Sequence, residues 1–335
     1  MSNSKKDKWI VVTTINNPTS AINKISEIVA KGDWRCVVVG DKKTPAGWSA
    51  PGIDYLSYDE QILKFGRLAE LLPANHYCRK NLGYIYAMRN GAEVILETDD
   101  DNIPYESFGY DISEEVQGEV VTGHKWANVY KHFTERLIWP RGNPLDTIHD
   151  AGTVSGLQSC RAPLQQFLAD GDPDVDAIYR LVFKEPLIFE QRSSIFLKEG
   201  TWCSFNSQNT LFQKEVFPLL YLPCHVSFRM TDIWRSFVAQ LGLWSINSQL
   251  VFRSATVVQE RNEHNLMRDF ADEVDGYLHN DRIVDCLTSV LDAHRGKPLP
   301  EVVRAAWVSL RDIGILKDVE LNIYDAWAEQ CRGMS

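Results

Sequence analysis

Short apolar runs alternate with stretches of helical periodicity through the first hundred residues of the chain. The apolar runs are rich in β-branched side chains, which is typical of buried strands, and they are residues 9–14, 36–39, 53–56 and 93–98. Apolar residues recur at helical spacing in residues 21–31, 59–71 and 79–90. Strands that alternate with helices predict an α/β fold with a largely parallel sheet.

The pattern becomes less regular after residue 102. The expected elements are strands at 119–122 and 187–189, a polar loop at 205–210, and helices after Met230 and from about 270 to 327, interrupted at 297–300. We therefore predict an α/β domain over residues 8–255 and a helical extension over residues 256–335.

Three polar clusters follow the predicted strands at the point where each strand ends. They are Thr13-Thr14, Gly40-Asp41 and Asp99 to Asn102. Ligands of open α/β sheets bind beyond the carboxyl ends of the strands, so we expect these clusters to meet in one crevice. The first strand–helix turn carries neither GxGxxG nor GxxxxGK[ST], which argues against a dinucleotide or P-loop site.

The acidic run Asp99-Asp100-Asp101 indicates a cation site. Adjacent carboxylates repel one another in a folded site, and a divalent cation offsets that repulsion. Carboxylate oxygens suit Mg²⁺ or Mn²⁺, which usually takes one or two of them and completes its shell with phosphates and water. The alternative is a solvated acidic turn that caps a helix.

Two basic segments are candidates for contact with phosphate. Arg79 and Lys80 begin a predicted helix, where basic residues are unfavourable for the helix dipole, so an anionic ligand would account for them. Arg141 lies between turn-forming residues in the segment 139–144, where it could contact a phosphate or the sugar. The alternatives are solvated charges on a surface helix and a plain structural loop.

Three further features remain open between a chemical and a structural role. The aspartates of residues 170–176 resemble a calcium loop but lack its spacing to a terminal Glu, and a loop with a helix cap also explains them. Asp232 follows Thr231 at a probable helix start, where it caps the helix or acts as a general base or sugar ligand. His264 is either a late metal ligand or a structural histidine.

Composition narrows the class of protein. A formal net charge of −10 argues against a broad surface for nucleic acid or anionic lipid. No stretch approaches the roughly 20 apolar residues of a membrane span. The seven cysteines are scattered and form no CxxC, which favours reduced thiols. We expect a soluble, cytoplasmic enzyme and leave homo-oligomerisation open.

Several of these segments resemble the STELLO-type glycosyltransferase family. The matching segments are 9–14, 40–45, 55–57, 79–84, 97–102, 172–181, 228–229 and 232–235. The resemblance covers most of residues 9–265. Plant members of the family are Golgi membrane proteins, whereas this sequence shows no membrane span. A more distant likeness is to the reversibly glycosylated polypeptides, which include UDP-arabinopyranose mutases.

The resemblance implies a GT-A-like nucleotide-diphospho-sugar transferase fold, followed by the helical extension. In such enzymes an acidic DXD-type motif after a strand binds Mn²⁺ or Mg²⁺ and the diphosphate. The resemblance implies this role for Asp99, Asp100 and Asp101, with Asp99 and Asp101 as the expected metal ligands and diphosphate contacts from Asp99 and Asp100. In the mutases an Arg downstream of the motif can carry the sugar, and Arg141 occupies a comparable place.

We therefore expect a Mn²⁺- or Mg²⁺-dependent glycosyltransferase of polysaccharide synthesis, which moves a sugar from an NDP-sugar, foremost a UDP-sugar, to a glycan acceptor. Its expected substrate-binding residues are Thr13, Thr14, Asp41, Arg79, Lys80, Asp99, Asp100 and Arg229, and its expected catalytic residues are Asp232 and Arg141. The alternatives are a UDP-sugar mutase that acts through Arg141 and an inactive scaffold that recruits other glycosyltransferases.

Overall fold

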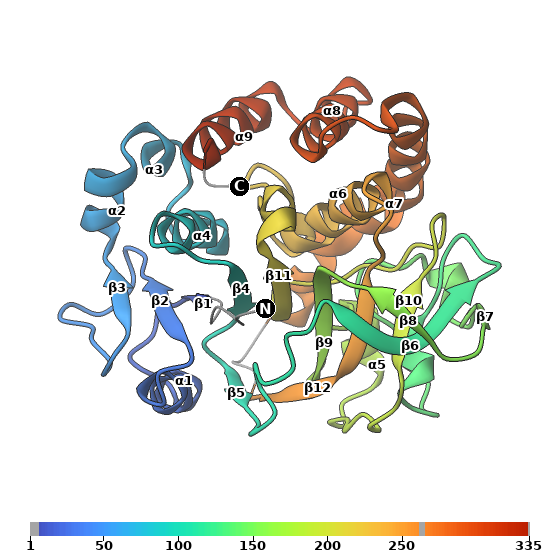
Figure 1. The fold of residues 1–335 in the computed structure, drawn as a ribbon, viewed down its shortest axis with the longest axis horizontal. Helices are drawn as coiled ribbons and strands as arrows, with labels where there is room; N and C mark the ends of the chain where they lie inside the picture. The colour runs from blue at the N-terminus through green and yellow to red at the C-terminus, as the bar shows by residue number, and fades with distance from the viewer. Residues whose placement is uncertain (1–6, 261–264, 334–335) are drawn as a thin grey trace, which may run out of the picture.

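The chain folds around one mixed sheet, and the first part of that sheet is parallel (Figure 1). The computed structural model describes residues 7–260 and 265–333. The parallel strands are β1 (Lys8–Thr13), β2 (Arg35–Val39), β3 (Asp54–Leu56) and β4 (Val94–Thr98). They lie in the order β3-β2-β1-β4, so the strand prediction for the first hundred residues is confirmed.

The second part of the sheet is mixed, so the expectation of a largely parallel sheet is wrong there. Its strands are β5 (Asn102–Pro104), β6 (Glu115–Thr122), β7 (Thr153–Val154), β8 (Gln158–Arg161), β9 (Leu164–Gly171), β10 (Ser194–Leu197), β11 (Asn209–Gln213) and β12 (Val251–Gln259). β11 runs antiparallel to both β4 and β9, which joins the two parts. Most of these strands lack the helical crossovers that impose parallel pairing.

The helices are α1 (Ser20–Ala30), α2 (Tyr58–Phe65), α3 (Arg67–Leu71), α4 (Lys80–Arg89), α5 (Ala177–Val182), α6 (Thr231–Ser245), α7 (Leu266–His294), α8 (Leu299–Asp312) and α9 (Asp318–Cys331). Short 3₁₀ turns are η1 (Tyr77–Arg79), η2 (Val129–His132), η3 (Leu145–Thr147), η4 (Lys214–Leu219) and η5 (Phe228–Met230). The helix expected over 59–71 is divided at Gly66, whose φ of 50° is left-handed. Residues 187–189 form no strand, only a bridge from Leu187 to Gly171.

The two faces of the parallel strands belong to different parts of the core. In β1, Trp9 and Val11 pack with helices α2, α3 and α4, whereas Ile10 and Val12 pack with α1. Side chains alternate between the faces of a strand, so a run of apolar residues is needed when both faces are covered. The sheet is therefore a middle layer, with α1 on one side and most helices on the other (Figure 1).

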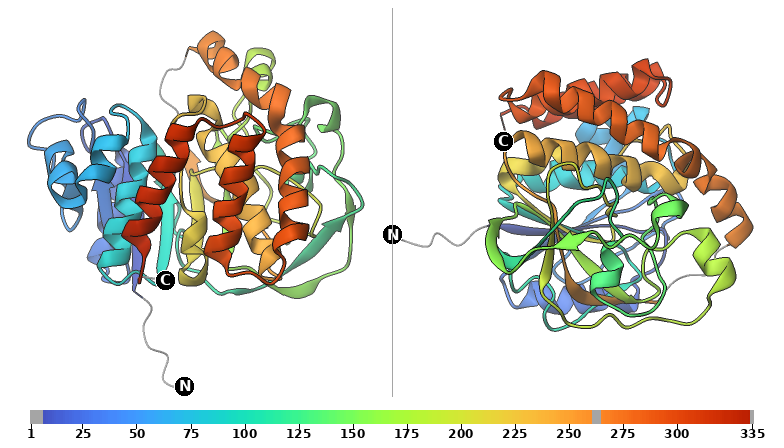
Figure 2. Two further views of the ribbon diagram at one scale, coloured as in Figure 1. Left: turned by 90° about the horizontal axis from the view of Figure 1, so that it is seen from above. Right: turned by 90° about the vertical axis from the view of Figure 1, so that its right-hand side faces the viewer.

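The last three helices form an outer layer over α6 and α4 (Figure 2). α6 is buried from Thr231 to Trp244, on all its sides, because the sheet lies beneath it and α7 and α8 lie above it. The break expected at 297–300 separates α7 from α8. The division into two domains stays a prediction, although β12 runs past residue 255 to Gln259.

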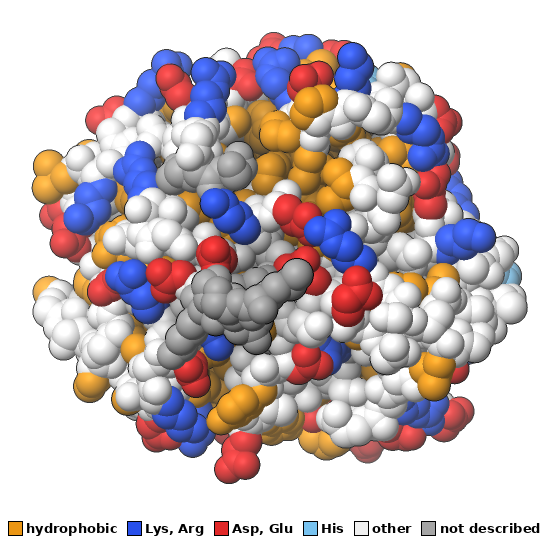
Figure 3. Space-filling view, viewed as in Figure 1, with side chains coloured by type: hydrophobic (Ala, Val, Ile, Leu, Met, Phe, Trp, Pro, Cys, Tyr) orange, Lys and Arg blue, Asp and Glu red, His pale blue; other side chains and the backbone are white. Residues whose placement is uncertain are grey.

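The surface carries charges of both signs. On the face shown in Figure 3, acidic and basic side chains are interspersed and form no broad patch of one sign. Among the described residues, no helix is long and apolar enough to cross a membrane.

Gly83 in α4 sets how closely this helix approaches the sheet. A Cβ at this position would lie 2.6 Å from Val11 Cγ1 and 2.8 Å from Val39 Cγ2. We expect Gly83→Ala to lower the free energy of unfolding by about 1–2 kcal/mol, because overpacking exceeds the helix propensity that Ala adds. Urea titration would measure the change. Gly156→Ala is the control, with nothing within 4 Å of the new Cβ; equal stability of both variants would contradict the close packing.

Candidate functional site

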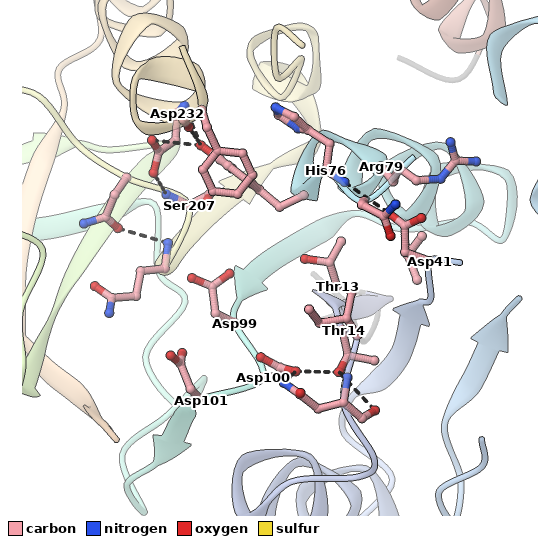
Figure 4. Close-up of a pocket in the computed structure, with 18 of the residues that line it drawn as sticks. Thr13, Thr14, Asp41, His76, Arg79, Asp99, Asp100, Asp101, Ser207 and Asp232 are labelled. Carbon is pink, nitrogen blue, oxygen red and sulfur yellow. Dashed lines mark hydrogen bonds between the residues drawn. The ribbon is translucent and has the colours of Figure 1, made fainter. Parts of the chain in front are cut away.

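The carboxyl ends of β1, β2 and β4 open on a cavity of about 500 Å³ (Figure 4). One wall comes from the ends of these strands and from η1. The opposite wall comes from residues 206–208 and from the start of α6. The predicted crevice is therefore present, and the polar clusters that follow the strands meet in it.

Most of the predicted site residues line this cavity. They are Thr13, Thr14, Asp41, Arg79, Asp99, Asp100, Asp101, Arg141, Arg229 and Asp232. Lys80 lies behind the wall, and its side chain is fully buried. His264 lies outside the described residues.

Asp100 points away from its neighbours toward the turn after β1 (Figure 4). Its carboxylate accepts hydrogen bonds from Thr14 Oγ1 and, at 3.1 Å, from Asn16 Nδ2. Its backbone oxygen accepts from Thr19, the N-cap of α1. Burial raises the pKa of Asp100, although these hydrogen bonds oppose the shift. Asp100 thus fixes the turn between β1 and α1.

Asp99 and Asp101 both extend into the cavity (Figure 4). Lys80 Nζ lies 2.7 Å from Asp99 Oδ1, and it also donates to the backbone oxygens of Thr98 and Ser207. Lys80 therefore positions Asp99, and its expected contact with a diphosphate stays a prediction. Asp101 Oδ2 accepts a hydrogen bond from Gln259 Nε2 at 3.1 Å.

Arg79 is also turned away from the cavity (Figure 4). Its Nε donates to Gln61 Oε1 at 2.6 Å, and its guanidinium lies 4.5 Å from the centre of the Tyr58 ring. The side chain thus holds helix α2 against η1, and its expected contact with a diphosphate stays a prediction. Asp41 accepts a hydrogen bond from the backbone N–H of His76 at 3.2 Å, which holds the start of η1 against the end of β2.

Arg141 lies buried between two aspartates on the opposite wall. Its Nε and Nη2 donate to Asp174 at 2.8 and 2.9 Å, and its Nη1 and Nη2 donate to Asp232 at 3.1 and 3.0 Å. Burial opposes the charged form of Arg141, but the two carboxylates outweigh it and raise its pKa well above the ordinary value. The guanidinium therefore stays protonated.

Asp232 is held as an anion by the same cluster. Burial tends to raise its pKa, but Arg141 outweighs this effect and lowers it. Its carboxylate also accepts hydrogen bonds from Tyr77 Oη at 3.2 Å and from the backbone N–H of Ser207 at 3.3 Å. A general base works best with a pKa near the operating pH, so this setting does not favour Asp232 as a general base.

Arg229 is anchored by the C-terminal helices. Its guanidinium forms an ion pair of 2.8 Å with Glu273 of α7, whose side chain is fully buried. Glu273 also accepts hydrogen bonds from the backbone N–H of Ala177 at 2.7 Å and from Tyr277 Oη at 2.9 Å. The helical extension thus determines the position and charge balance of a residue in the cavity.

The aspartates of residues 170–176 do not converge on a calcium ion. Asp170 accepts hydrogen bonds from Tyr105 and Phe189, Asp172 bonds Arg180, Asp174 bonds Arg141, and Asp176 is the N-cap of α5. The structural interpretation of this segment holds, except that Asp174 belongs to the cavity. The spacing of the aspartates in the sequence draws attention to this segment, but it does not show which group each carboxylate bonds.

Comparison with known proteins identifies the relatives of this chain. The family model of the STELLO glycosyltransferases matches residues 229–312. The Arabidopsis thaliana protein named "Probable glycosyltransferase STELLO2" is 29% identical over 305 residues, which cover 84% of this chain and 39% of that protein. "Probable glycosyltransferase STELLO1" of the same plant is 28% identical over 308 residues, with 85% and 39% covered.

The chain is similar to the STELLO-type glycosyltransferases over most of its length. The resemblance seen in the sequence is thereby confirmed. The chain spans about two fifths of the length of these STELLO relatives. The family match begins at Arg229 and includes Asp232 at the cavity and Glu273 behind it.

Removal of Arg141 should destabilise this STELLO-type chain strongly. Arg141→Met leaves two buried carboxylates without their cation, and we expect a loss of about 3–5 kcal/mol in the free energy of unfolding. Chemical denaturation would test it. Arg304→Met is the matched control: its ion pair with Asp325 is exposed, and it should cost less than about 1 kcal/mol. Similar losses in both variants would contradict the buried cluster.

Asp176 should make stability depend on pH. Burial raises its pKa to about 6, and Glu273 adds to the shift, against hydrogen bonds from Trp139 and Tyr179. The folded state then binds more protons than the unfolded state between about pH 4 and 6, so stability falls as pH rises through this range.

We expect Asp176→Asn to flatten this profile by an amount on the order of 2–3 kcal/mol between pH 4 and 7. Urea titrations at several pH values would measure it. Asp146→Asn, an exposed position, should leave the profile unchanged. A wild-type profile that is already flat over this range would contradict the assignment.

Proposed function

We propose that this chain is a metal-dependent glycosyltransferase with a GT-A-type fold, which moves a sugar from a nucleoside diphosphate sugar, foremost a UDP-sugar, to a glycan acceptor. One observation carries the proposal: the acidic run after β4 meets the strand-end residues Thr13, Thr14 and Asp41 in a single cavity. The two STELLO relatives, both named as probable glycosyltransferases, support the reaction class.

The charge balance of the cavity supports the requirement for a cation. Six aspartates and three arginines line it, a formal excess of three negative charges. Behind the wall, the positive charge of Lys80 and the negative charge of Glu273 offset each other. An anionic diphosphate would meet repulsion in such a cavity, and a divalent cation removes much of it.

Asp99 and Asp101 fit a Mg²⁺ or Mn²⁺ ion. Both present hard carboxylate oxygens to the cavity, and Lys80 holds Asp99 in place. Among the described residues, no three acidic, His or Cys side chains converge into a ready metal site. Two carboxylates are sufficient when substrate phosphates and water complete the shell. When bound, the ion would neutralise charge on the leaving diphosphate.

The surroundings of Arg141 argue against the mutase alternative. A nucleophilic arginine must lose a proton, but the two carboxylates beside Arg141 raise its pKa. All five of its N–H groups are also occupied: four donate to these carboxylates, and Nη1 further donates to the backbone oxygen of Arg229. A role in shaping the sugar side of the cavity fits this arrangement better.

Metal-dependent binding of a nucleotide sugar would test the proposal. We expect UDP-sugars to raise the melting temperature in the presence of Mn²⁺ but not of EDTA, because a ligand that binds the folded state stabilises it. Asp99→Asn and Asp101→Asn should each abolish the Mn²⁺-dependent increase, and transfer to a glycan acceptor should fall with it.

Asp111→Asn is the matched control, since this exposed aspartate bonds Arg253 and Ser113 and lies outside the cavity. It should respond to ligand as the wild type does. If no nucleotide sugar stabilises the wild-type chain with Mn²⁺, the transferase and the mutase both fail, and the scaffold alternative remains.

A further inference from the structure

The wall that faces the acidic run has a charge balance that limits which sugars it can accept. This sugar-side wall consists of Arg141, Asp174, Asn206, Gln208, Arg229 and Asp232. Two of these residues are cationic and two are anionic. An arginine whose charge is not compensated by a carboxylate of the protein would bind a carboxylate of the ligand, whereas an arginine with a compensated charge would not.

Arg141 has no donor left for a ligand. A guanidinium has five N–H groups. The Nε, Nη1 and Nη2 atoms of Arg141 donate four hydrogen bonds to the carboxylates of Asp174 and Asp232. Nη1 donates a fifth to the backbone oxygen of Arg229. The cluster of Arg141, Asp174 and Asp232 therefore has one negative charge in excess, because two carboxylates share one cation.

The positive charge of Arg229 is compensated by Glu273, which lies behind the wall. Glu273 is fully buried and lies on the side away from the cavity lining, and it pairs with the guanidinium through two contacts, 2.9 Å from Nε and 2.8 Å from Nη2. The four charged residues of the sugar-side wall and Glu273 together therefore carry a net charge of −1, even though the wall contains two arginines.

What this wall offers a ligand is mainly hydrogen-bond acceptors. Asp174 contributes carboxylate oxygens that each accept one bond from Arg141, and Asn206 and Gln208 contribute amide groups that both donate and accept. Sugar hydroxyl groups can donate to such oxygens. The oxygens of Asp232 already accept four hydrogen bonds, so Asp232 acts on a ligand mainly through its charge. A carboxylate on the sugar would instead meet two anions in a partly enclosed cavity, where both arginines among the described residues of this wall already pair with carboxylates.

We infer that the donor of this chain carries a neutral, hydroxyl-rich sugar and that the sugar-side wall rejects uronic acids. This inference rests on the proposed function, since it names the substrate class of the same cavity. The neutral donor and its uronate counterpart differ only at C6, so the preference between them reports the charge balance of the wall.

Isothermal titration with matched donors in the presence of Mn²⁺ would test it. The pairs are UDP-glucose with UDP-glucuronic acid and UDP-galactose with UDP-galacturonic acid. We expect the neutral member of the preferred pair to bind on the order of tenfold more tightly or better, the change that one unfavourable charge contact produces.

Glu273→Gln tests the physical cause. The amide keeps the shape of the side chain but leaves the charge of Arg229 uncompensated, so the affinity ratio within a pair should move several-fold toward the uronate. Glu320→Gln is the matched control. Glu320 is also a buried carboxylate of the C-terminal helices, it accepts hydrogen bonds from the N–H groups of Cys224 and His225, and it does not line the cavity.

The outcomes separate this inference from the proposed function. A uronate that binds as tightly as its neutral partner overturns the inference and leaves the glycosyltransferase proposal standing. A ratio that Glu273→Gln leaves unchanged, or that Glu320→Gln shifts equally, overturns its physical basis. If none of the four donors binds with Mn²⁺, the proposed function fails and the inference falls with it.

Discussion

The buried guanidinium of Arg141 holds together three segments that are distant in the sequence. It lies in the loop 139–144 and bonds Asp174 in the loop before α5 and Asp232 at the start of α6. A charge removed from water is tolerated only when its partners stay in place, so the three segments keep fixed relative positions. The N-terminus of α6 in turn places Phe228 and Arg229 at the cavity. The whole wall that faces the acidic run depends on this cluster.

The acidic run shows how adjacent residues acquire different roles. Asp99 and Asp101 lie on one side of the chain and face the cavity, while Asp100 faces the turn after β1. The run forms a tight turn, in which the backbone N–H of Asn102 donates to the backbone oxygen of Asp99 at 3.3 Å, and this turn directs Asp100 away from its two neighbours. Repulsion within the run is thereby reduced, because Asp100 bonds hydroxyl and amide groups while Lys80 compensates Asp99.

Local patterns predicted the first half of the fold and the position of the cavity. The buried strands before residue 100 and the helices between them follow from periodicity, and the site follows from the rule that ligands bind at the carboxyl ends of parallel strands. The strand order beyond β4 depends on pairings between segments far apart in the chain, such as β11 with β4, which periodicity does not encode.

The roles of the charged residues were harder to predict for the same reason. Lys80 was correctly associated with the site, but the sequence does not show that its ammonium lies behind Asp99. Arg79 and Asp174 have partners that only the folded chain brings near, Gln61 for the one and Arg141 for the other. A charged residue near a site can bind a ligand or support a neighbour, and burial decides between the two.

The pairing of Arg229 with Glu273 has a consequence for how such chains diversify. One residue lies at the cavity and the other in α7, so the outer helices contribute to the electrostatics of the cavity as well as to the packing around α6. Recombination that exchanged only the segment after residue 265 between relatives would transfer part of the ligand preference along with it. The outer helices and the sheet are therefore expected to change together, as a single inherited unit.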